Sequence, residues 1–409
     1  MSLEFNKVVE QVQTMGRFLA HQANGNATKL ERALELFYAA TDLDEVHDRI
    51  KLVRDSSVSG YRGAAPLPRP FDEIVCGVGD PPPMPDDGTV IAVDGSQIYP
   101  DQHSYAQFYL INISTFVYYH GATRVPFQAT APHLYYSDND VLDKDGRLIT
   151  NQTVNARRSL MEVQRLADMA WELRGETRPL VAIHDGGLLK FFGATDVAGA
   201  HEIERDYMKA LEKVFHAEGL LIGYIDVPRS KYLVSLLHLL SLQPDQVNDA
   251  NLKTKGEIEG LTDAMLYALV LQPGERSALM VQNSPQNREY KDRGAEYEIA
   301  SFYMNVSNHT GRPSIARIDV PMWVAKDKLA IAHIHALITA QCAIQGRRHY
   351  PYALTRSDEL AYISGGEKSQ LDELIRTAMR NATLEPEISN KLQTKGLARS
   401  NKRQHKIKV

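Results

Sequence analysis

The sequence lacks the features that would tie it to a membrane, a disulfide framework or an ATP site. Its 409 residues include only two cysteines, Cys76 and Cys342, which stand far apart without a CxxC spacing. This spacing argues against a disulfide framework and a structural zinc site, and it fits a reducing cytoplasm. No apolar run approaches the roughly 18 residues of a membrane span, and the first residues lack the apolar core of an export signal. These absences together predict a cytoplasmic protein. No GxxxxGK[ST] sequence is present, so we do not expect the chain itself to hydrolyse ATP.

Positive charge is concentrated at the C-terminal end of the chain. The formal net charge of −5 gives no whole-chain sign of nucleic-acid binding. Between residues 391 and 409 there are seven cationic residues and no acid: Lys391, Lys395, Arg399, Lys402, Arg403, Lys406 and Lys408. We expect this tail to be disordered and to attract polyanions such as DNA non-specifically, although a solubilising role fits the same residues.

The hydrophobic pattern divides the chain into four parts. Residues 1–65 carry apolar residues at helical spacing, and residues 66–88 form a Pro/Gly-rich linker. Residues 89–385 are expected to form one domain, and 386–409 the basic tail. In this domain, apolar strands are expected at 89–95, 105–120, 178–187, 220–228, 277–282, 299–306 and 315–320, and helices at 151–174, 201–218, 230–240 and 327–345. Such alternation predicts an α/β fold whose sheet is covered by helices on both faces.

Two of the predicted strands, VIAVDG and LVAIHDG, end in an aspartate followed by glycine. Functional groups collect at the carboxyl ends of strands in a covered α/β sheet, so Asp94 and Asp185 are expected side by side at one edge. Carboxylates held close together repel unless a cation bridges them, and hard oxygen ligands suit Mg²⁺ or Mn²⁺. Ordinary turn chemistry also explains Asp-Gly, and these residues alone leave both interpretations open.

A third acid, Glu162, lies in the predicted helix at 151–174. Arg158 and Arg165 stand four residues before it and three after it. That spacing is typical of an ion pair on the surface of a helix. Spacing alone therefore gives Glu162 no role as a metal ligand.

Five motifs, in this order, resemble those of the NurA family: AVDGSQIYPDQH, HDGGLLKFF, GLLIGYIDVPRS, RIDVPMWVA and YPYALTRSDELAYIS. The resemblance covers residues 90–375. NurA proteins are manganese-dependent nucleases with an RNase H-like core, and they act with the hexameric ATPase HerA on DNA ends. The resemblance thus implies an RNase H-like core with a mixed sheet flanked by helices, preceded here by an N-terminal helical region.

The resemblance also assigns site residues. It implies that Asp94 and Asp185 are metal ligands, that Glu162 is the third carboxylate, and that Tyr350 belongs to the site. Where archaeal members tend to have a histidine, this chain has Asp358, which can bind a cation through oxygen but cannot act as a histidine proton donor. The neighbouring Glu359 is an alternative ligand. The implied ion is Mn²⁺, with Mg²⁺ as an alternative.

The implied activity is that of a metal-dependent DNA nuclease, of the 5′–3′ exonuclease and single-strand endonuclease type. The implied partners are DNA, a HerA-type hexameric ATPase or translocase, and a second copy of the chain in a homodimer. The rival hypothesis is a catalytically weak adaptor that loads DNA into a motor ATPase. The departure at Asp358 favours the adaptor, whereas the set of Asp94, Glu162 and Asp185 favours the nuclease.

Overall fold

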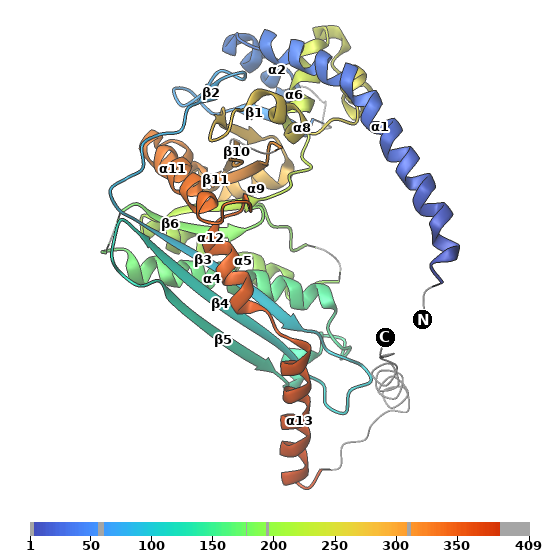
Figure 1. Cartoon of the computed structure of the whole chain (residues 1–409), viewed down its shortest axis with the longest axis vertical. Helices are drawn as coiled ribbons and strands as arrows, with labels where there is room; N and C mark the ends of the chain where they lie inside the picture. The colour runs from blue at the N-terminus through green and yellow to red at the C-terminus, as the bar shows by residue number, and fades with distance from the viewer. Residues whose placement is uncertain (1–3, 56–60, 177, 194–195, 309–311, 385–409) are drawn as a thin grey trace, which may run out of the picture. The chain divides into compact units, whose positions relative to one another are not determined.

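The computed structural model describes residues 4–55, 61–176, 178–193, 196–308 and 312–384 (Figure 1). The chain divides into two compact units. The first unit comprises Met1–Pro85, Gly186–Leu189 and Leu221–Pro351, and the second comprises Asp86–Asp185, Lys190–Leu220 and Tyr352–Val409. The predicted basic tail lies outside the described residues. Within those residues, no helix combines the length and the apolar character that crossing a membrane requires.

The strands of the second unit form the mixed sheet that the resemblance implied. They lie in the order β6 (Leu180–Asp185), β3 (Gly88–Ile98), β4 (Tyr109–His120) and β5 (Phe127–Tyr135). β3, β4 and β5 run antiparallel, and β6 runs parallel to β3. β5 has no counterpart in the sequence pattern, because most of its residues are exposed and no apolar alternation marks it. It is an edge strand, where Pro132 is tolerated.

The helices of the second unit are α3 (Asp138–Val141), α4 (Asn151–Leu173), α5 (Ala200–His216), α12 (Tyr352–Ala361) and α13 (Gly365–Asn381). Adjacent residues on a strand point to opposite faces of a sheet, so the contacts of two neighbours on β4 locate α4 and α12. Ser114 Oγ donates to the backbone oxygen of Ser357 in α12 (2.6 Å). Thr115 Oγ1 instead accepts a hydrogen bond from Arg165 of α4 (3.0 Å). α4 and α12 therefore cover opposite faces (Figure 1).

The first unit has strands in the order β1 (Ala64–Pro66), β9 (Met280–Gln282), β10 (Ile299–Asn305), β11 (Ile315–Pro321) and β7 (Leu220–Ile225). β8 (Arg276–Ser277) pairs with β10 and with β2 (Val78–Gly79). Its helices are α1 (Asn6–Ala39), α2 (Leu43–Asp55), α6 (Tyr232–Ser241), α7 (Asp249–Lys253), α8 (Asp263–Val270), α9 (Pro285–Arg293), α10 (Met322–Ala325) and α11 (Lys328–Ile344), with 3₁₀ turns at Pro244–Gln246, Gly256–Ile258 and Ala295–Tyr297.

The predicted N-terminal helices are confirmed, and α2 and the C-terminal part of α1 pack within the first unit. Phe37 of α1, Leu236 of α6 and Tyr267 of α8 are almost completely buried in one hydrophobic cluster. The segment predicted as a linker contributes Val75 to the same cluster. Glu73 in that segment pairs with Arg276 through two contacts of 2.9 Å. The domain boundaries at residues 65 and 88 stay a prediction.

Candidate active site

The pairing register of the second unit places Asp94 and Asp185 at equivalent positions. β3 and β6 pair in parallel from Thr89 opposite Leu180 to Val93 opposite His184, and each aspartate is the next residue on its strand. The prediction that this strand ends with Asp94 and Gly95 is wrong: β3 continues to Ile98, and Asp94 pairs with Ser114 of β4. β3 continues because its antiparallel partner β4 extends past the last residue of β6.

Glu162 does not lie on the helix surface, as its spacing from the arginines suggested. Its residue surface is only 5% exposed. The predicted pair with Arg158 forms, with Arg158 Nε 3.2 Å from Glu162 Oε1. Arg165 instead binds Thr115. α4 thus turns Glu162 toward the sheet rather than toward solvent.

Gly95 lets α4 come this close to β3. A Cβ atom at position 95 would lie 2.7 Å from Glu162 Oε1 and 2.8 Å from Arg158 Cγ. Both distances are shorter than a van der Waals contact, so a side chain at position 95 would displace Glu162 or Arg158. The glycine that follows Asp94 therefore makes room for the third carboxylate rather than for a turn.

Asp358 is positioned by α12, which side chains of β3 and β4 hold against the sheet. Ser96 Oγ and Asn112 Nδ2 both donate to the backbone oxygen of Ala361, the second at 3.0 Å. Ser114 Oγ donates to the backbone oxygen of Ser357, one residue before Asp358. These contacts fix the C-terminal half of α12, which carries Asp358, against the strand that carries Asp94.

Asp358 and Glu359, the two candidate acids on α12, differ in their partners. Glu359 forms an ion pair with Arg356 on the same helix. The negative charge of Asp358 instead contributes to raising the pKa of Asp94. We call Asp94, Glu162, Asp185 and Asp358 the acidic cluster.

The Asp94 carboxyl group has a strongly shifted pKa. Burial is the largest cause, and the charges of Asp358 and Asp185 add to it, so that the pKa rises from 3.8 to about 6. The backbone N–H of Gly95 and the charge of Arg158 oppose this rise only in part. Asp94 is thus a carboxylate whose ionised form lacks sufficient compensation from the protein.

Burial also raises the pKa of Glu162, and the charges of Asp94 and Asp185 raise it further. Arg158 and Lys190 act in the opposite direction. Sequence reasoning gave neither cation a place in the site: it treated Arg158 as part of a surface ion pair, and Lys190 lies in the HDGGLLKFF motif without a role. These two cations therefore offset part of the negative charge around Glu162.

The donor chemistry of the acidic cluster fits a hard divalent cation. Glu162 Oε1 lies 3.2 Å from Arg158 Nε but accepts no hydrogen bond, which is costly for a buried carboxylate and which a bound cation would correct. Within the described residues, however, no three His, Cys, Asp or Glu side chains are gathered as a ready-made metal site. Asp94 shares the face of β3 with Ser96, which contacts α12, whereas Glu162 approaches from α4 on the other face. The carboxylates therefore approach β3 from two faces.

Tyr350, the fifth predicted site residue, belongs to the first unit. Its ring packs edge-on against Tyr224, with 5.3 Å between the ring centroids. Its backbone oxygen accepts a hydrogen bond of 2.9 Å from Gln345 Nε2. These contacts account for its place in the first unit, and its role in the site stays a prediction.

Comparison with known proteins identifies a relationship for most of the second unit and part of the first. The family model described as the NurA domain matches residues 88–363. The crystal structure of the NurA nuclease from Sulfolobus solfataricus is similar with a TM-score of 0.50 and 11% identity, covering 92% of this chain and 98% of that chain. This likeness, together with the strand order of the second unit, confirms the predicted RNase H-like fold.

Two further solved structures are more distant. The catalytic domain of human endonuclease V has a TM-score of 0.31 and 14% identity, over 81% of this chain and 95% of that one. Endonuclease V from Ciona intestinalis, solved with a DNA 24-mer that contains inosine, has a TM-score of 0.29 and 11% identity, over 70% and 86%. No curated protein matches the sequence.

Proposed function

This chain belongs to the NurA family of nucleases, and we propose that it is a divalent-metal-dependent deoxyribonuclease that hydrolyses phosphodiester bonds in DNA. The observation that carries the proposal is the acidic cluster. Asp94 and Asp185 are adjacent in register, Glu162 is buried beside Gly95, and Asp358 acts electrostatically on Asp94. Carboxylates that raise one another's pKa are concentrated at functional sites.

Asp94, Glu162, Asp185 and Asp358 would hold Mn²⁺, with Mg²⁺ as the alternative. When bound, such an ion supplies a water of lowered pKa and offsets the charge that develops on the phosphate. The residues themselves supply position. Gly95 and Arg158 hold Glu162 at the end of the parallel pairing between β3 and β6, and α12 holds Asp358 against β3.

DNA binding in this proposal depends mainly on the sugar-phosphate backbone. Arg158 is fixed by Glu162, by the backbone oxygen of Gly95 (3.1 Å) and by Gln97 Oε1 (3.1 Å), so it forms a rigid positive group beside the carboxylates. Contacts to the backbone position a strand without reading its bases. We therefore expect little sequence preference.

Family membership also supports a finer proposal about context. The chain would act as a 5′–3′ exonuclease and single-strand endonuclease, as a homodimer, together with a HerA-type hexameric ATPase in DNA end processing. Its two cysteines are both free thiols, which fits work in the reducing cytoplasm.

The second candidate function is a catalytically weak adaptor that loads DNA into a motor ATPase. Two observations favour it: the carboxylate at Asp358, and the lack of a ready-made group of three metal ligands in the described residues. The test is degradation of an end-labelled single strand by the purified full chain. The nuclease proposal predicts cleavage with Mn²⁺ that a chelator abolishes. DNA binding without any metal-dependent cleavage would support the adaptor instead.

A further inference from the structure

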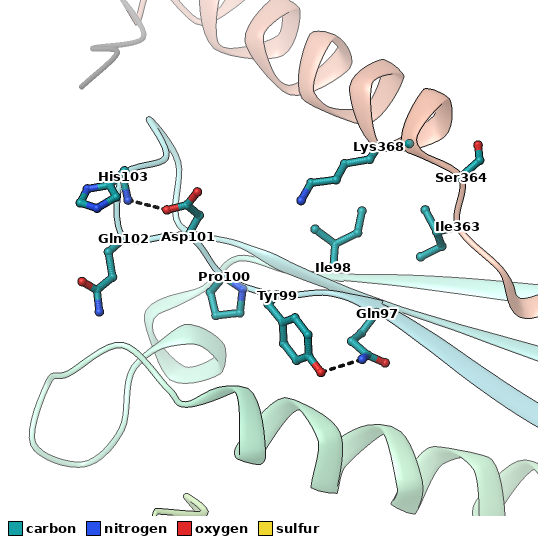
Figure 2. Close-up of a pocket in the computed structure, with 11 residues that line it drawn as sticks. Gln97, Ile98, Tyr99, Pro100, Asp101, Gln102, His103, Ile363, Ser364 and Lys368 are labelled. Atoms are coloured by element: carbon teal, nitrogen blue, oxygen red, sulfur yellow. Dashed lines mark hydrogen bonds between the residues drawn. The ribbon is translucent and has the colours of Figure 1, made fainter. Parts of the chain in front are cut away.

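A cavity of about 470 Å³ lies in the second unit, between the end of β3 and the start of α13 (Figure 2). We call it the β3–α13 pocket. Its volume lies in the range of small-molecule sites, roughly 300–1,000 Å³. Figure 2 shows Lys368 extending from α13 along one side and Tyr99 and Gln97 on the other, with Ile98 between them. Ile363 adds a second apolar side chain.

A chain of polar contacts connects this pocket with the acidic cluster. Tyr99 accepts a hydrogen bond from Gln97 Nε2 (2.8 Å) and donates one to Asn155 Oδ1 (2.7 Å). Gln97 Oε1 accepts one from Arg158 Nη1 (3.1 Å), and Arg158 Nε pairs with Glu162 Oε1 (3.2 Å). The pocket wall and the third carboxylate are therefore held by the same side chains.

The contacts also give the direction and the distance. Asn155, Arg158 and Glu162 lie on one face of α4. They run antiparallel to Gly95 and Gln97 of β3 and to Tyr99, which follows that strand. From Asp94 to Ile98, a strand that rises about 3.3 Å per residue covers about 13 Å. A stacked DNA strand that rises about 3.4 Å per nucleotide covers this distance in about four nucleotides.

We propose that the β3–α13 pocket binds one nucleotide of the DNA strand whose phosphodiester bond lies at the acidic cluster. Lys368 pairs with its phosphate, and Ile98 and Ile363 pack against its sugar and base. This inference rests on the proposed function and adds a second point of contact, which determines where the strand lies relative to the carboxylates.

The charges of the pocket favour a nucleotide within a strand over a free one. Asp101 lines the same pocket as Lys368. A phosphodiester carries a single negative charge, which one lysine can balance, whereas the additional charge of a terminal phosphate would face Asp101. α13 is held in position because Tyr105 donates to the backbone oxygen of Asp372 (2.7 Å) and Arg376 lies over the Tyr105 ring (5.3 Å).

The test measures binding of a labelled single-stranded oligonucleotide to the full chain in chelator, at several salt concentrations. The variants are Lys368→Met, Ile363→Ala and the control Lys209→Met. Lys209 is an exposed lysine of α5 in the same unit, paired with Asp206 at 3.0 Å. Deoxynucleoside monophosphate is added as a competitor in a second arm. Thermal melting confirms that each variant is folded.

We expect Lys368→Met to weaken binding roughly fivefold to tenfold at low salt. The slope of log K against log[salt], which is negative, should become less steep by about 0.7, the value for one phosphate of a single strand. Ile363→Ala should weaken binding without changing the slope, because the contact that it removes is apolar. Lys209→Met should match the unaltered chain, and the monophosphate should compete poorly. Equal affinities and slopes for Lys368→Met and Lys209→Met would overturn the inference, and strong competition by the monophosphate would make the ligand a free nucleotide instead.

Failure of the proposed function has a different signature. Binding in chelator requires no catalysis. If the chain never cleaves DNA with Mn²⁺ but Lys368→Met still weakens binding, the nuclease proposal is refuted and the pocket proposal holds. If the chain cleaves DNA normally but Lys368→Met binds DNA as the control does, only the proposal that the pocket binds a nucleotide is refuted.

Discussion

At the scale of single residues, two buried carboxylates of this chain differ in how completely the protein satisfies their hydrogen bonds. Asp263 of the first unit is fully buried, and it accepts hydrogen bonds from the backbone N–H groups of Tyr232 and Val234 and from the hydroxyl of Tyr303. Glu162 has an arginine beside it but leaves one buried oxygen without a hydrogen bond. Asp263 has partners that stabilise α6, whereas in the proposed site a bound cation would satisfy the Glu162 oxygen that accepts no hydrogen bond.

The first prediction concerns the stability of the protein without metal. The pKa of Asp94 is about 6 in the folded chain and 3.8 ordinarily, so the folded state binds more protons than the unfolded state between these values. Its stability therefore falls as pH rises through this window. Asp94→Asn should remove a penalty on the order of 2–3 kcal/mol at pH 8 and little at pH 4. Denaturant unfolding in chelator at both pH values measures this, and an unaltered or lower stability of the variant at pH 8 would contradict it.

The second prediction concerns Gly95. Gly95→Ala places a methyl group against Glu162 Oε1 and Arg158 Cγ, so Glu162 must move while the strand remains. We expect a folded protein whose cleavage rate falls roughly tenfold to a hundredfold, as for the loss of an oriented ligand. The matched control is Gly175→Ala, because an added Cβ there meets nothing within 4 Å. Equal cleavage rates for the two variants would show that the position of Glu162 does not matter for cleavage.

The third prediction concerns Asp358. If it is an oxygen ligand, Asp358→Asn should raise the Mn²⁺ concentration needed for half-maximal cleavage, because a charge is lost while the shape is kept. Asp358→His should remain active and show a new pH dependence near roughly 6.5, the ordinary pKa of histidine. Rate measured against Mn²⁺ for the three proteins decides the matter. An unchanged Mn²⁺ concentration for half-maximal cleavage in Asp358→Asn would show that Asp358 is not a metal ligand.

At the scale of elements, the sequence predicted what depends on local pattern. The apolar runs of β3 and β6 and the helical spacing of α4 gave the correct types, and the Asp-Gly endings placed Asp94 and Asp185 together. The edge strand β5 lacks a hydrophobic pattern because most of it is exposed. The burial of Glu162 depends on the close approach of α4 at Gly95, a contact across 67 positions of sequence that no local spacing encodes.

The fourth prediction concerns the C-terminal basic segment. Deletion of residues 391–409 removes seven cations, so the affinity for DNA should fall most at low ionic strength while cleavage of bound DNA persists. Binding isotherms of the full and the shortened chain at two salt concentrations measure the effect. Equal affinities at low salt would leave the tail with a solubilising role.

At the scale of the whole molecule, the acidic cluster and the β3–α13 pocket belong to one compact unit, and Tyr350 and the N-terminal helices belong to the other. The four carboxylates of the proposed site thus lie on two neighbouring strands of one sheet and on two helices that cover its opposite faces. The first unit supplies a separate core, built on α1, α2, α6 and α8, that contains none of these carboxylates.

The central claim is that Asp94 and Asp185 would hold the divalent ion on which DNA cleavage depends. The most direct test is the rate at which the full chain cleaves an end-labelled single strand as Mn²⁺ is titrated, in Asp94→Asn, Asp185→Asn and the control Asp226→Asn. Asp226 follows the end of β7 in the first unit, so the control removes an aspartate from a similar position outside the cluster. We predict that both cluster variants lose at least about a hundredfold in rate while the control matches the unaltered chain. Near-normal turnover of either cluster variant at saturating Mn²⁺ would contradict the claim.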